Sequence, residues 1–267
     1  MPIHFCSLAS GSSGNSQFVA SDNTRLLLDA GLSGKYITGA LEHIGESLKA
    51  VDALLITHEH SDHIKGAGVI YRKIRRPIYA TAATWQALDG KLGEIAPEHR
   101  CVVSAGESFQ IGDITIKPIG ISHDAAEPVA YAFGNGEARM CVATDLGHCP
   151  EGVQAEFLSC DLLMLESNHD VNMLKVGPYP YYLKRRILSD IGHLSNETAA
   201  QVIARVVAEG RVRSVLLGHL SKENNLPELA YETVGGIVAG TGIRLGEDLQ
   251  LDLTYRDRVG MLYHIRK

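Results

Sequence analysis

Short apolar runs, rich in leucine or β-branched residues, recur along the chain, and each ends abruptly in a polar or titratable residue. Such runs are too short for a typical helix and have the pattern of buried strands. The runs RLLLDAG, ALLITHEHSDH, ITIKPIGISHD, RMCVATDLGH, DLLMLESNHD and SVLLGHLS begin at residues 25, 53, 114, 139, 161 and 214. Layered α/β folds place their functional sites at strand ends. We therefore expect the histidines, aspartates and glutamates that close these runs to carry the chemistry.

Helical patterns lie between the predicted strands. Residues 61–76 begin with a Ser-Asp pair suited to capping, residues 84–93 have a weaker pattern, and residues 195–210 run from Ser195, a suitable N-cap, to a closing glycine. The last of these is the clearest helix. Since no long linker or low-complexity segment interrupts the pattern, the sequence predicts one α/β domain over residues 1–267.

Composition narrows the class of protein. The 267 residues are 45% hydrophobic and 21% charged, as in an ordinary globular protein. The N-terminus lacks a basic segment followed by an apolar run, and no apolar stretch approaches the roughly 20 residues that cross a bilayer. Five cysteines without a C-x-x-C pair indicate reduced thiols. We therefore expect a cytoplasmic protein with no membrane contact, and we infer no obligate protein partner.

The net charge of -6 argues against bulk attraction to nucleic acid or anionic lipid. Any such binding would depend on local clusters of cations.

The sharpest chemical signal is HEHSDH at residues 58–63, the pattern H-x-H-x-D-H at the end of a predicted strand. In an extended segment His58 and His60 face the same side, whereas Asp62 and His63, at a helix start, can turn toward a neighbouring point. One hexapeptide can thus supply two adjacent metals. Imidazole and carboxylate ligands without thiolate suit zinc or manganese. The alternative is a cluster of surface histidines.

Further candidate ligands follow other apolar runs. They are His123, Asp145 and His219. Asp145 suits a bridging position, because a centre with metals about 3.5–4 Å apart needs a shared anion. Taken singly, each of the three could also be a hydrogen-bonded core or rim residue.

This series, H-x-H-x-D-H followed by a lone histidine, an aspartate after a strand and a late histidine, resembles the metallo-β-lactamase superfamily. The resemblance runs from Asp29, which matches the family's early strand-end aspartate, to His219. It implies a four-layered αββα sandwich with two divalent metal ions, Zn or Mn, at one edge. It also implies a first metal on His58, His60 and His123, a second on Asp62, His63 and His219, and Asp145 bridging them.

Two further residues indicate the reaction. Glu166 follows LLML, and His193 lies in GHLS just before the predicted helix 195–210. This order resembles the phosphodiesterase branch that includes ribonuclease Z and the β-CASP nucleases, where the matching histidine contacts the scissile phosphate or helps to protonate the leaving group. A phosphodiester needs an activated water, charge neutralisation and a proton for its alkoxide. We therefore assign Asp62, Glu166 and His193 to the catalytic set, although structural hydrogen bonds would also explain Glu166 and His193.

Six segments resemble one subfamily more closely. SLASGSSGNS, HEHSDH, ATDLGH, LESNHD, ILSDIGHLSNE and LGHLSKENN occur in the order typical of the YycJ/WalJ group, to which 5′-to-3′ exonuclease activity on duplex DNA is attributed. The chain has no room for a β-CASP insertion between Asp145 and His193. The resemblance implies a metal-dependent phosphodiesterase that hydrolyses nucleic acid, with DNA as the favoured substrate.

Candidate substrate contacts come from two segments. Residues 171–189 contain four cations and three tyrosines and no acid, which suits a single-stranded or frayed end. A solvated basic helix whose tyrosines pack on the body is the alternative. Residues 7–16, SLASGSSGNS, join predicted strands at 3–8 and 16–20 as a glycine turn that could approach a phosphate or could be a plain hairpin turn. The candidate contacts are Ser10, Gly11, Ser12, Asn15, His169, Lys184, Arg185, Arg186 and Ser195.

Other functions remain open from the sequence. A phosphodiesterase for a small cyclic or diester phosphate would need no basic groove and fits the net charge of -6 better. A lactone or thioester hydrolase would not require a proton donor at His193. A metal-stabilised regulatory protein without catalysis would be favoured by missing ligands, and here all seven ligand positions are filled.

Overall fold

The computed structural model describes residues 2–136 and 138–266. The chain divides into two compact units, each described by itself below. The first unit consists of Met1–Gly120, Ala125–Ala138 and Tyr255–Lys267, and the second of Ile121–Asp124 and Arg139–Thr254. The prediction of one domain over residues 1–267 stays a prediction.

The first unit contains a seven-stranded mixed sheet of order β14-β1-β2-β3-β4-β5-β6. Strands β14, β1, β2 and β3 pair antiparallel, whereas β3 to β6 pair parallel. The carboxyl ends of β3 and β4 therefore lie at the same edge. The strands are β1 (Ile3–Ala9), β2 (Ser16–Ala20), β3 (Arg25–Leu28), β4 (Ala53–Leu55), β5 (Ile78–Thr81), β6 (Arg100–Val103) and β14 (Tyr263–Ile265).

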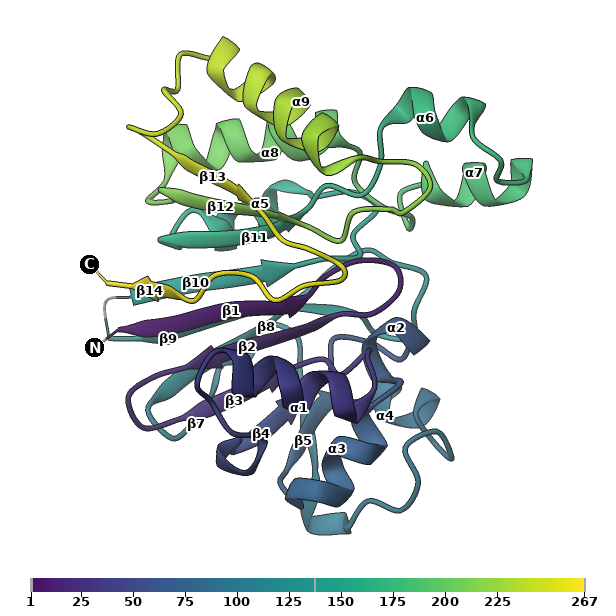
Figure 1. Ribbon diagram of the computed structural model, residues 1–267, viewed down its shortest axis with the longest axis vertical. Helices are drawn as coiled ribbons and strands as arrows, with labels where there is room; N and C mark the ends of the chain where they lie inside the picture. The colour runs from purple at the N-terminus through teal and green to yellow at the C-terminus, as the bar shows by residue number, and fades with distance from the viewer. Residues whose placement is uncertain (1, 137, 267) are drawn as a thin grey trace. The chain divides into compact units, whose positions relative to one another are not determined.

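Helices α1 (Gly34–His43) and α3 (Ala67–Ile74) lie along one face of this sheet (Figure 1). Each buries an apolar side, and Ile37 of α1 and Ile70 of α3 join the same core as Leu27 and Leu54 of the strands. Ser33 caps α1 by accepting a hydrogen bond from the Tyr36 N–H. The unit also contains α2 (Ser61–Ile64), α4 (Ala82–Ala87) and the short 3-10 turns η1 (Leu48–Ala50) and η2 (Pro97–His99).

The predicted helix 61–76 is wrong in its extent, because the chain forms two short helices there, α2 and α3. The break lies at Gly66, whose N–H donates to the Ala30 carbonyl at 2.7 Å. A Cβ at Gly66 would lie 2.0 Å from the Leu32 carbonyl oxygen, so the close approach of these two segments requires glycine. The helix predicted at 84–93 was also misplaced, since Thr81 caps α4 and the helix ends at Ala87.

The first unit also has an antiparallel meander of β7 (Phe109–Ile111), β8 (Ile114–Gly120) and β9 (Val129–Asn135). Its inward-facing residues, including Tyr131 and Phe133, are fully buried. The Tyr131 hydroxyl donates to the Ile56 carbonyl at 3.2 Å. This contact ties the meander to the segment that leads from β4 to the histidine motif.

The second unit has four parallel strands in the order β13-β12-β11-β10. They are β10 (Ala138–Ala143), β11 (Leu162–Glu166), β12 (Ser214–Gly218) and β13 (Gln250–Leu253). Because neighbouring parallel strands end at the same edge, the residues after β10, β11 and β12 are brought together. The strands predicted from the six apolar runs are confirmed across both units.

The helices of the second unit are α5 (Glu151–Phe157), α6 (Val171–Val176), α7 (Tyr181–Ile187), α8 (Asn196–Glu209) and α9 (Pro227–Gly240). The prediction of α8 is confirmed, with Ser195 accepting a hydrogen bond from the Thr198 N–H and Gly210 at the C-cap. Helices α8 and α9 lie side by side in this unit, and α6 and α7 form a separate pair (Figure 1). In the part of the chain that the structure describes, no helix combines the length and the apolar character needed to cross a membrane.

A prediction follows for the single-domain assignment. The chain has one tryptophan, Trp85, which is buried in the first unit, whereas the two 14-residue helices α8 and α9 of the second unit contribute strongly to far-UV circular dichroism. If the chain unfolds as one domain, the fluorescence of Trp85 and the far-UV circular dichroism should change with the same urea midpoint. The substitution Ile203→Ala, at a buried position of α8, should lower the free energy of unfolding by roughly 2–5 kcal/mol and lower both urea midpoints together. If Ile203→Ala lowered the midpoint of the circular dichroism but left the midpoint of Trp85 fluorescence unchanged, the single-domain assignment would be contradicted.

Candidate metal and catalytic site

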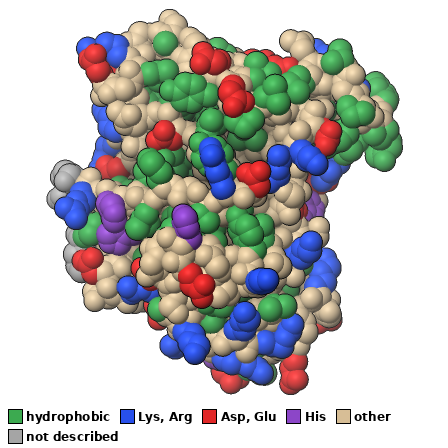
Figure 2. All heavy atoms as spheres, in the orientation of Figure 1, with side chains coloured by type: hydrophobic (Ala, Val, Ile, Leu, Met, Phe, Trp, Pro, Cys, Tyr) green, Lys and Arg blue, Asp and Glu red, His purple; other side chains and the backbone are tan. Residues whose placement is uncertain are grey.

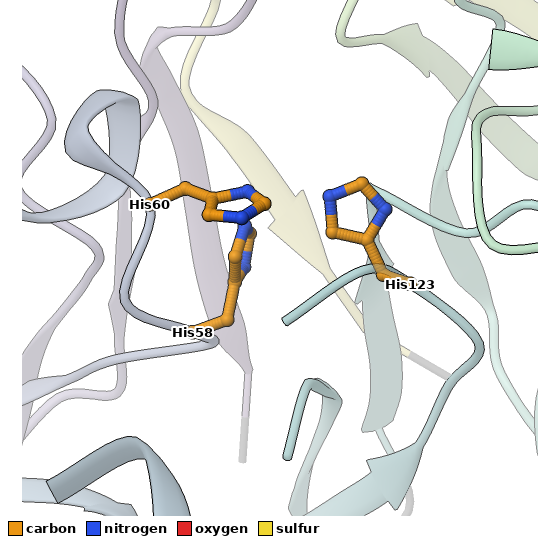
Figure 3. Close-up of side chains that lie close together, drawn as sticks. All are labelled: His58, His60 and His123. Carbon is orange, nitrogen blue, oxygen red and sulfur yellow. The ribbon is translucent and has the colours of Figure 1, made fainter. Parts of the chain in front are cut away.

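The histidine motif of the first unit follows β4 and brings three imidazoles together. The rings of His58 and His60 have centroids 4.6 Å apart, and those of His58 and His63 are 4.1 Å apart. Figure 3 shows the rings of His58 and His60 side by side, both reached from the segment after β4. Asp62 lies in α2 with its carboxylate 3.6 Å from His63 Nε2. The four residues are therefore grouped in this unit as a set of imidazole and carboxylate donors.

Asp29 fixes the ring of His63. Its Oδ2 lies 2.7 Å from His63 Nδ1, and its two oxygens also accept hydrogen bonds from the Thr57 N–H and hydroxyl, both at 2.9 Å. Asp29 and His63 are buried. With the Nδ1 proton donated to a carboxylate, the lone pair of His63 is at Nε2, the form in which a histidine binds a metal. The sequence resemblance marked Asp29, but its role as the group that orients His63 was not predicted.

The turn of residues 10–15 joins β1 to β2 and is held mainly by Asn15. The Asn15 side chain accepts from the Gly11 N–H at 3.0 Å and donates to the Gly11 carbonyl at 3.2 Å. Its Nδ2 also lies 3.1 Å from His63 Nε2. Ser10 and Asn15 are buried, whereas Ser12 is exposed. The turn thus touches the histidine motif, and a role for Ser10, Gly11, Ser12 and Asn15 in phosphate binding stays a prediction.

In the second unit, one carboxylate organises the residues at the strand ends. Glu166, at the end of β11, is fully buried, and its Oε1 lies 2.7 Å from His193 Nδ1 and 2.9 Å from His219 Nδ1. Its Oε2 accepts the Leu146 N–H at 2.9 Å. Burial acts to raise the pKa of Glu166, but the two histidines and their hydrogen bonds outweigh burial and lower the pKa to about 2. The two histidines therefore favour the ionised form of Glu166.

Asp145 completes this group. One ligand atom from each of Asp145, Glu166, His193 and His219 lies within 4.8 Å of the others. Asp145 Oδ1 is 3.4 Å from His219 Nδ1 and 3.8 Å from His123 Nε2. The second unit thus places four residues that are far apart in sequence around one point.

Backbone strain marks the same positions. Among the described residues, positive φ angles outside glycine occur at Asp29, Arg75, Asp145 and His219, with values of 59, 51, 61 and 54 degrees. Asp29 and His219 come directly after a strand, and Asp145 comes two residues after the end of β10. These three residues belong to the groups described above. A residue other than glycine with a positive φ angle has a strained backbone. Such residues persist where the surrounding contacts hold them, often at functional sites.

His123 is held by a loop contact that the sequence did not reveal. Its Nδ1 lies 3.1 Å from the Gly192 carbonyl, which accepts the ring proton. Burial lowers the pKa of His123, and this favours the neutral ring that a metal requires. Figure 3 shows the His123 side chain, which extends from the loop of residues 121–124.

Arg186 lies in an unexpected place. Its Nη2 donates to Asp124 Oδ1 at 2.7 Å, and its Nε donates to Asp124 Oδ2. The bidentate pair joins α7 to the residue next to His123. Arg186, a candidate phosphate contact from the sequence, is thus placed on a carboxylate 62 residues away. Lys184 and Arg185 form no such pair with Asp124 among the contacts of the described residues.

His169 and Ser195 lie at the start of α8. His169 is buried, its carbonyl accepts the Asn196 N–H at 2.9 Å, and within residues 2–136 and 138–266 neither of its ring nitrogens has a hydrogen-bond partner. Burial lowers the pKa of His169 to about 4, so its ring is neutral. The Ser195 hydroxyl serves as the helix cap. Their roles as substrate contacts stay predictions.

Comparisons with known proteins agree with the fold. Residues 24–219 match the family described as the β-lactamase superfamily domain. The exodeoxyribonuclease YycJ of Bacillus anthracis is 41% identical over 94% of this chain and 95% of that protein. The exodeoxyribonuclease WalJ of Streptococcus pneumoniae is 42% identical over 97% of this chain and 96% of that protein.

Among solved structures, the metallo-β-lactamase fold protein YhfI from Bacillus subtilis has a TM-score of 0.75 at 15% identity and covers 99% of this chain and 100% of its own. This likeness confirms the predicted fold class. The chain belongs to the β-lactamase superfamily and, within it, to the family of the YycJ and WalJ proteins.

Proposed function

We propose that this chain is a metal-dependent phosphodiesterase that hydrolyses nucleic acid, with DNA as its substrate and 5′-to-3′ exonuclease activity as its mode of action. Two relatives that span nearly the whole chain are named exodeoxyribonucleases. The observation that carries the proposal is the contact of His193 Nδ1 with the buried Glu166 at 2.7 Å, in the same group as Asp145 and His219. We also propose a cytoplasmic location, because all five cysteines are free thiols, as expected in a reducing compartment.

The donor residues of both units fit two divalent metal ions, zinc or manganese, because they are imidazoles and carboxylates. The rings of His63 and His219 each donate Nδ1–H to a buried carboxylate, which leaves Nε2 for a metal. We propose His58, His60 and His123 for one ion, Asp62, His63 and His219 for the other, and Asp145 as the bridge. When bound, such ions activate water and neutralise charge on a phosphate.

The protein's own contribution to the reaction lies in His193. Its Nδ1 is fixed by Glu166, so Nε2, on the opposite side of the ring, is the atom that can give a proton to the leaving oxygen. A poor alkoxide leaving group needs such a donor, whereas the thiolate that leaves a thioester does not. The pair therefore favours a phosphodiester over a thioester.

A second candidate substrate is a small cyclic or diester phosphate. The net charge of -6 favours it over a polyanion, since the chain as a whole repels nucleic acid. Nucleic acid and a small phosphodiester can be distinguished as substrates, because only cleavage of nucleic acid should require cations outside the metal site.

The substitution His193→Gln should lower the rate of DNA cleavage roughly 100- to 10,000-fold, because it removes the proton donor. Both metal ions should remain bound, as shown by metal analysis. His58→Ala should lose metal as well as activity, and His43→Gln, in α1 and outside the candidate site, should behave as the wild type. The measurement is cleavage of duplex and single-stranded DNA and RNA, labelled at either end, by metal-loaded protein.

Labels at the two ends report the polarity of digestion in the same assay. If the metal-loaded wild type left all of these strands intact but hydrolysed bis-p-nitrophenyl phosphate, the small-diester function would replace the exonuclease. Hydrolysis of lactones or thioesters alone would overturn both.

The ion pair of Arg186 with Asp124 generates a separate prediction. Since it fixes the residue next to His123, Arg186→Leu should weaken metal binding about 10- to 100-fold, as expected for loss of a contact behind a ligand. Competition with a chromogenic chelator measures this affinity. Arg185→Leu, one position away and without this carboxylate partner, is the matched control and should retain the wild-type affinity. Equal metal affinity in the two variants would contradict this role of Arg186.

A further inference from the structure

Helices α6 and α7 form an exposed pair in the second unit. They occupy residues 171–187, between Glu166 at the end of β11 and His193 before α8. Figure 2 shows hydrophobic side chains gathered on the part of the surface where Figure 1 has α6 and α7. We call residues 176–182, which join the two helices, the α6–α7 tip.

The tip exposes large apolar side chains to an unusual degree. Val176 is 86% exposed, Tyr181 76% and Tyr182 74%, and further along the same segment Leu188 and Ile191 are about half exposed. Five of the nine large hydrophobic residues that are exposed among the described residues lie within positions 176–191. Apolar surface concentrated in this way marks a binding surface more often than singly scattered residues do.

The cations of this segment differ in their contacts. Lys184 Nζ donates to the Lys175 carbonyl at 2.8 Å, across the helix pair, and the Arg185 guanidinium lies 6.0 Å from the centre of the Tyr181 ring. Both side chains therefore lie close to the tip. Arg186 instead pairs with Asp124 and serves as an anchor. Residues 171–189 contain no acid, so a positive charge accompanies the exposed rings.

The other end of the helix pair is fixed beside the candidate proton donor. The His193 N–H donates to the Ile187 carbonyl at 3.0 Å, and the Ser122 hydroxyl donates to the Asp190 carbonyl at 2.7 Å. A Cβ at Gly192 would lie 2.2 Å from the Ile187 carbonyl oxygen, so this turn is tight. The exposed tip is therefore carried on a base that is tied to His193 and to the loop of His123.

We propose that Tyr181 and Tyr182 stack on unpaired nucleotides of the substrate, while Lys184 and Arg185 contact the phosphates between those nucleotides. This inference rests on the proposed nuclease function. Exposed aromatic rings beside cations bind single strands without regard to sequence, since every base offers a face for stacking. On a chain of net charge -6, such local cations are needed to hold a polyanion. The helix pair would thus hold the end of a strand next to the site of cleavage.

Other occupants fit the tip less well. A protein partner would have to complement three cations, Lys175, Lys184 and Arg185, with no acid in this segment. A membrane surface is usually bound by longer amphipathic helices than the six and seven residues of α6 and α7. The tyrosine hydroxyls also favour a wet, polar partner over a lipid interior. Single-stranded nucleic acid matches both the rings and the charge.

The test measures binding separately from cleavage. Metal-loaded His193→Gln protein is titrated into a DNA duplex with a single-stranded tail that contains 2-aminopurine, and into the same duplex with blunt ends. In this background Tyr181→Ala with Tyr182→Ala should raise the dissociation constant for the tailed duplex about tenfold or more and abolish the quenching of 2-aminopurine. Tyr181→Phe with Tyr182→Phe should instead keep the affinity and the quenching of 2-aminopurine, because phenylalanine retains an aromatic face for stacking.

Several controls make the outcome decisive. Met261→Ala removes an exposed apolar side chain elsewhere, in the first unit, and should leave the affinity unchanged. Replacing Arg185 by glutamine should reduce the slope of log affinity against log salt by about one unit. Metal content and urea midpoint report that each variant is folded.

An unchanged affinity of the double alanine variant for tailed DNA would overturn the inference while leaving the nuclease function intact, provided the wild type cleaves DNA. Binding of the wild type to anionic vesicles, or self-association in sedimentation, that disappears in the double alanine variant without any loss of DNA binding would also overturn it and assign the tip to a membrane or to a second copy. Failure of the wild type to cleave any nucleic acid would instead contradict the proposed function itself.

Discussion

The candidate site depends on buried carboxylates that hold imidazole rings in one orientation. Asp29 does this for His63 in the first unit, and Glu166 does it for His193 and His219 in the second. A buried carboxylate is costly unless charged or hydrogen-bonded groups surround it, and backbone N–H groups of Thr57 and Leu146 supply part of that compensation. Each carboxylate is thereby fixed before any metal or substrate binds, and the rings that depend on it are fixed as well.

The fold positions these groups through parallel strands. Asp29 follows β3 and the histidine motif follows β4 in the first unit, while Asp145, Glu166 and His219 lie at the ends of β10, β11 and β12 in the second. The apolar strands bury their side chains on both faces, so the first positions available for polar chemistry are the ends. The left-handed backbone at Asp29, Asp145 and His219 turns each side chain away from the direction of its strand.

The sequence predicts the parts of this arrangement that depend on local pattern. Apolar runs located the strands, and the spacing of His58 and His60 predicted that their rings would face the same side, as the 4.6 Å separation of the rings shows. The extent of helix 61–76 could not be predicted, because it depends on the carbonyl oxygen of Leu32 behind Gly66. The pairing of Arg186 with Asp124 was likewise out of reach, since a basic residue in an acid-free segment gives no sign of a partner 62 positions away.

One oxygen of Glu166 accepts hydrogen bonds from both His193 and His219, and this sharing has a chemical consequence. Both rings therefore depend on the position of this one atom, and a substitution at Glu166 would release both of them. The orientation of the His193 ring is therefore not independent of that of His219. Because imidazole and carboxylate donors alone do not indicate a reaction, the proposed choice of a phosphodiester rests on the contact of His193 with Glu166.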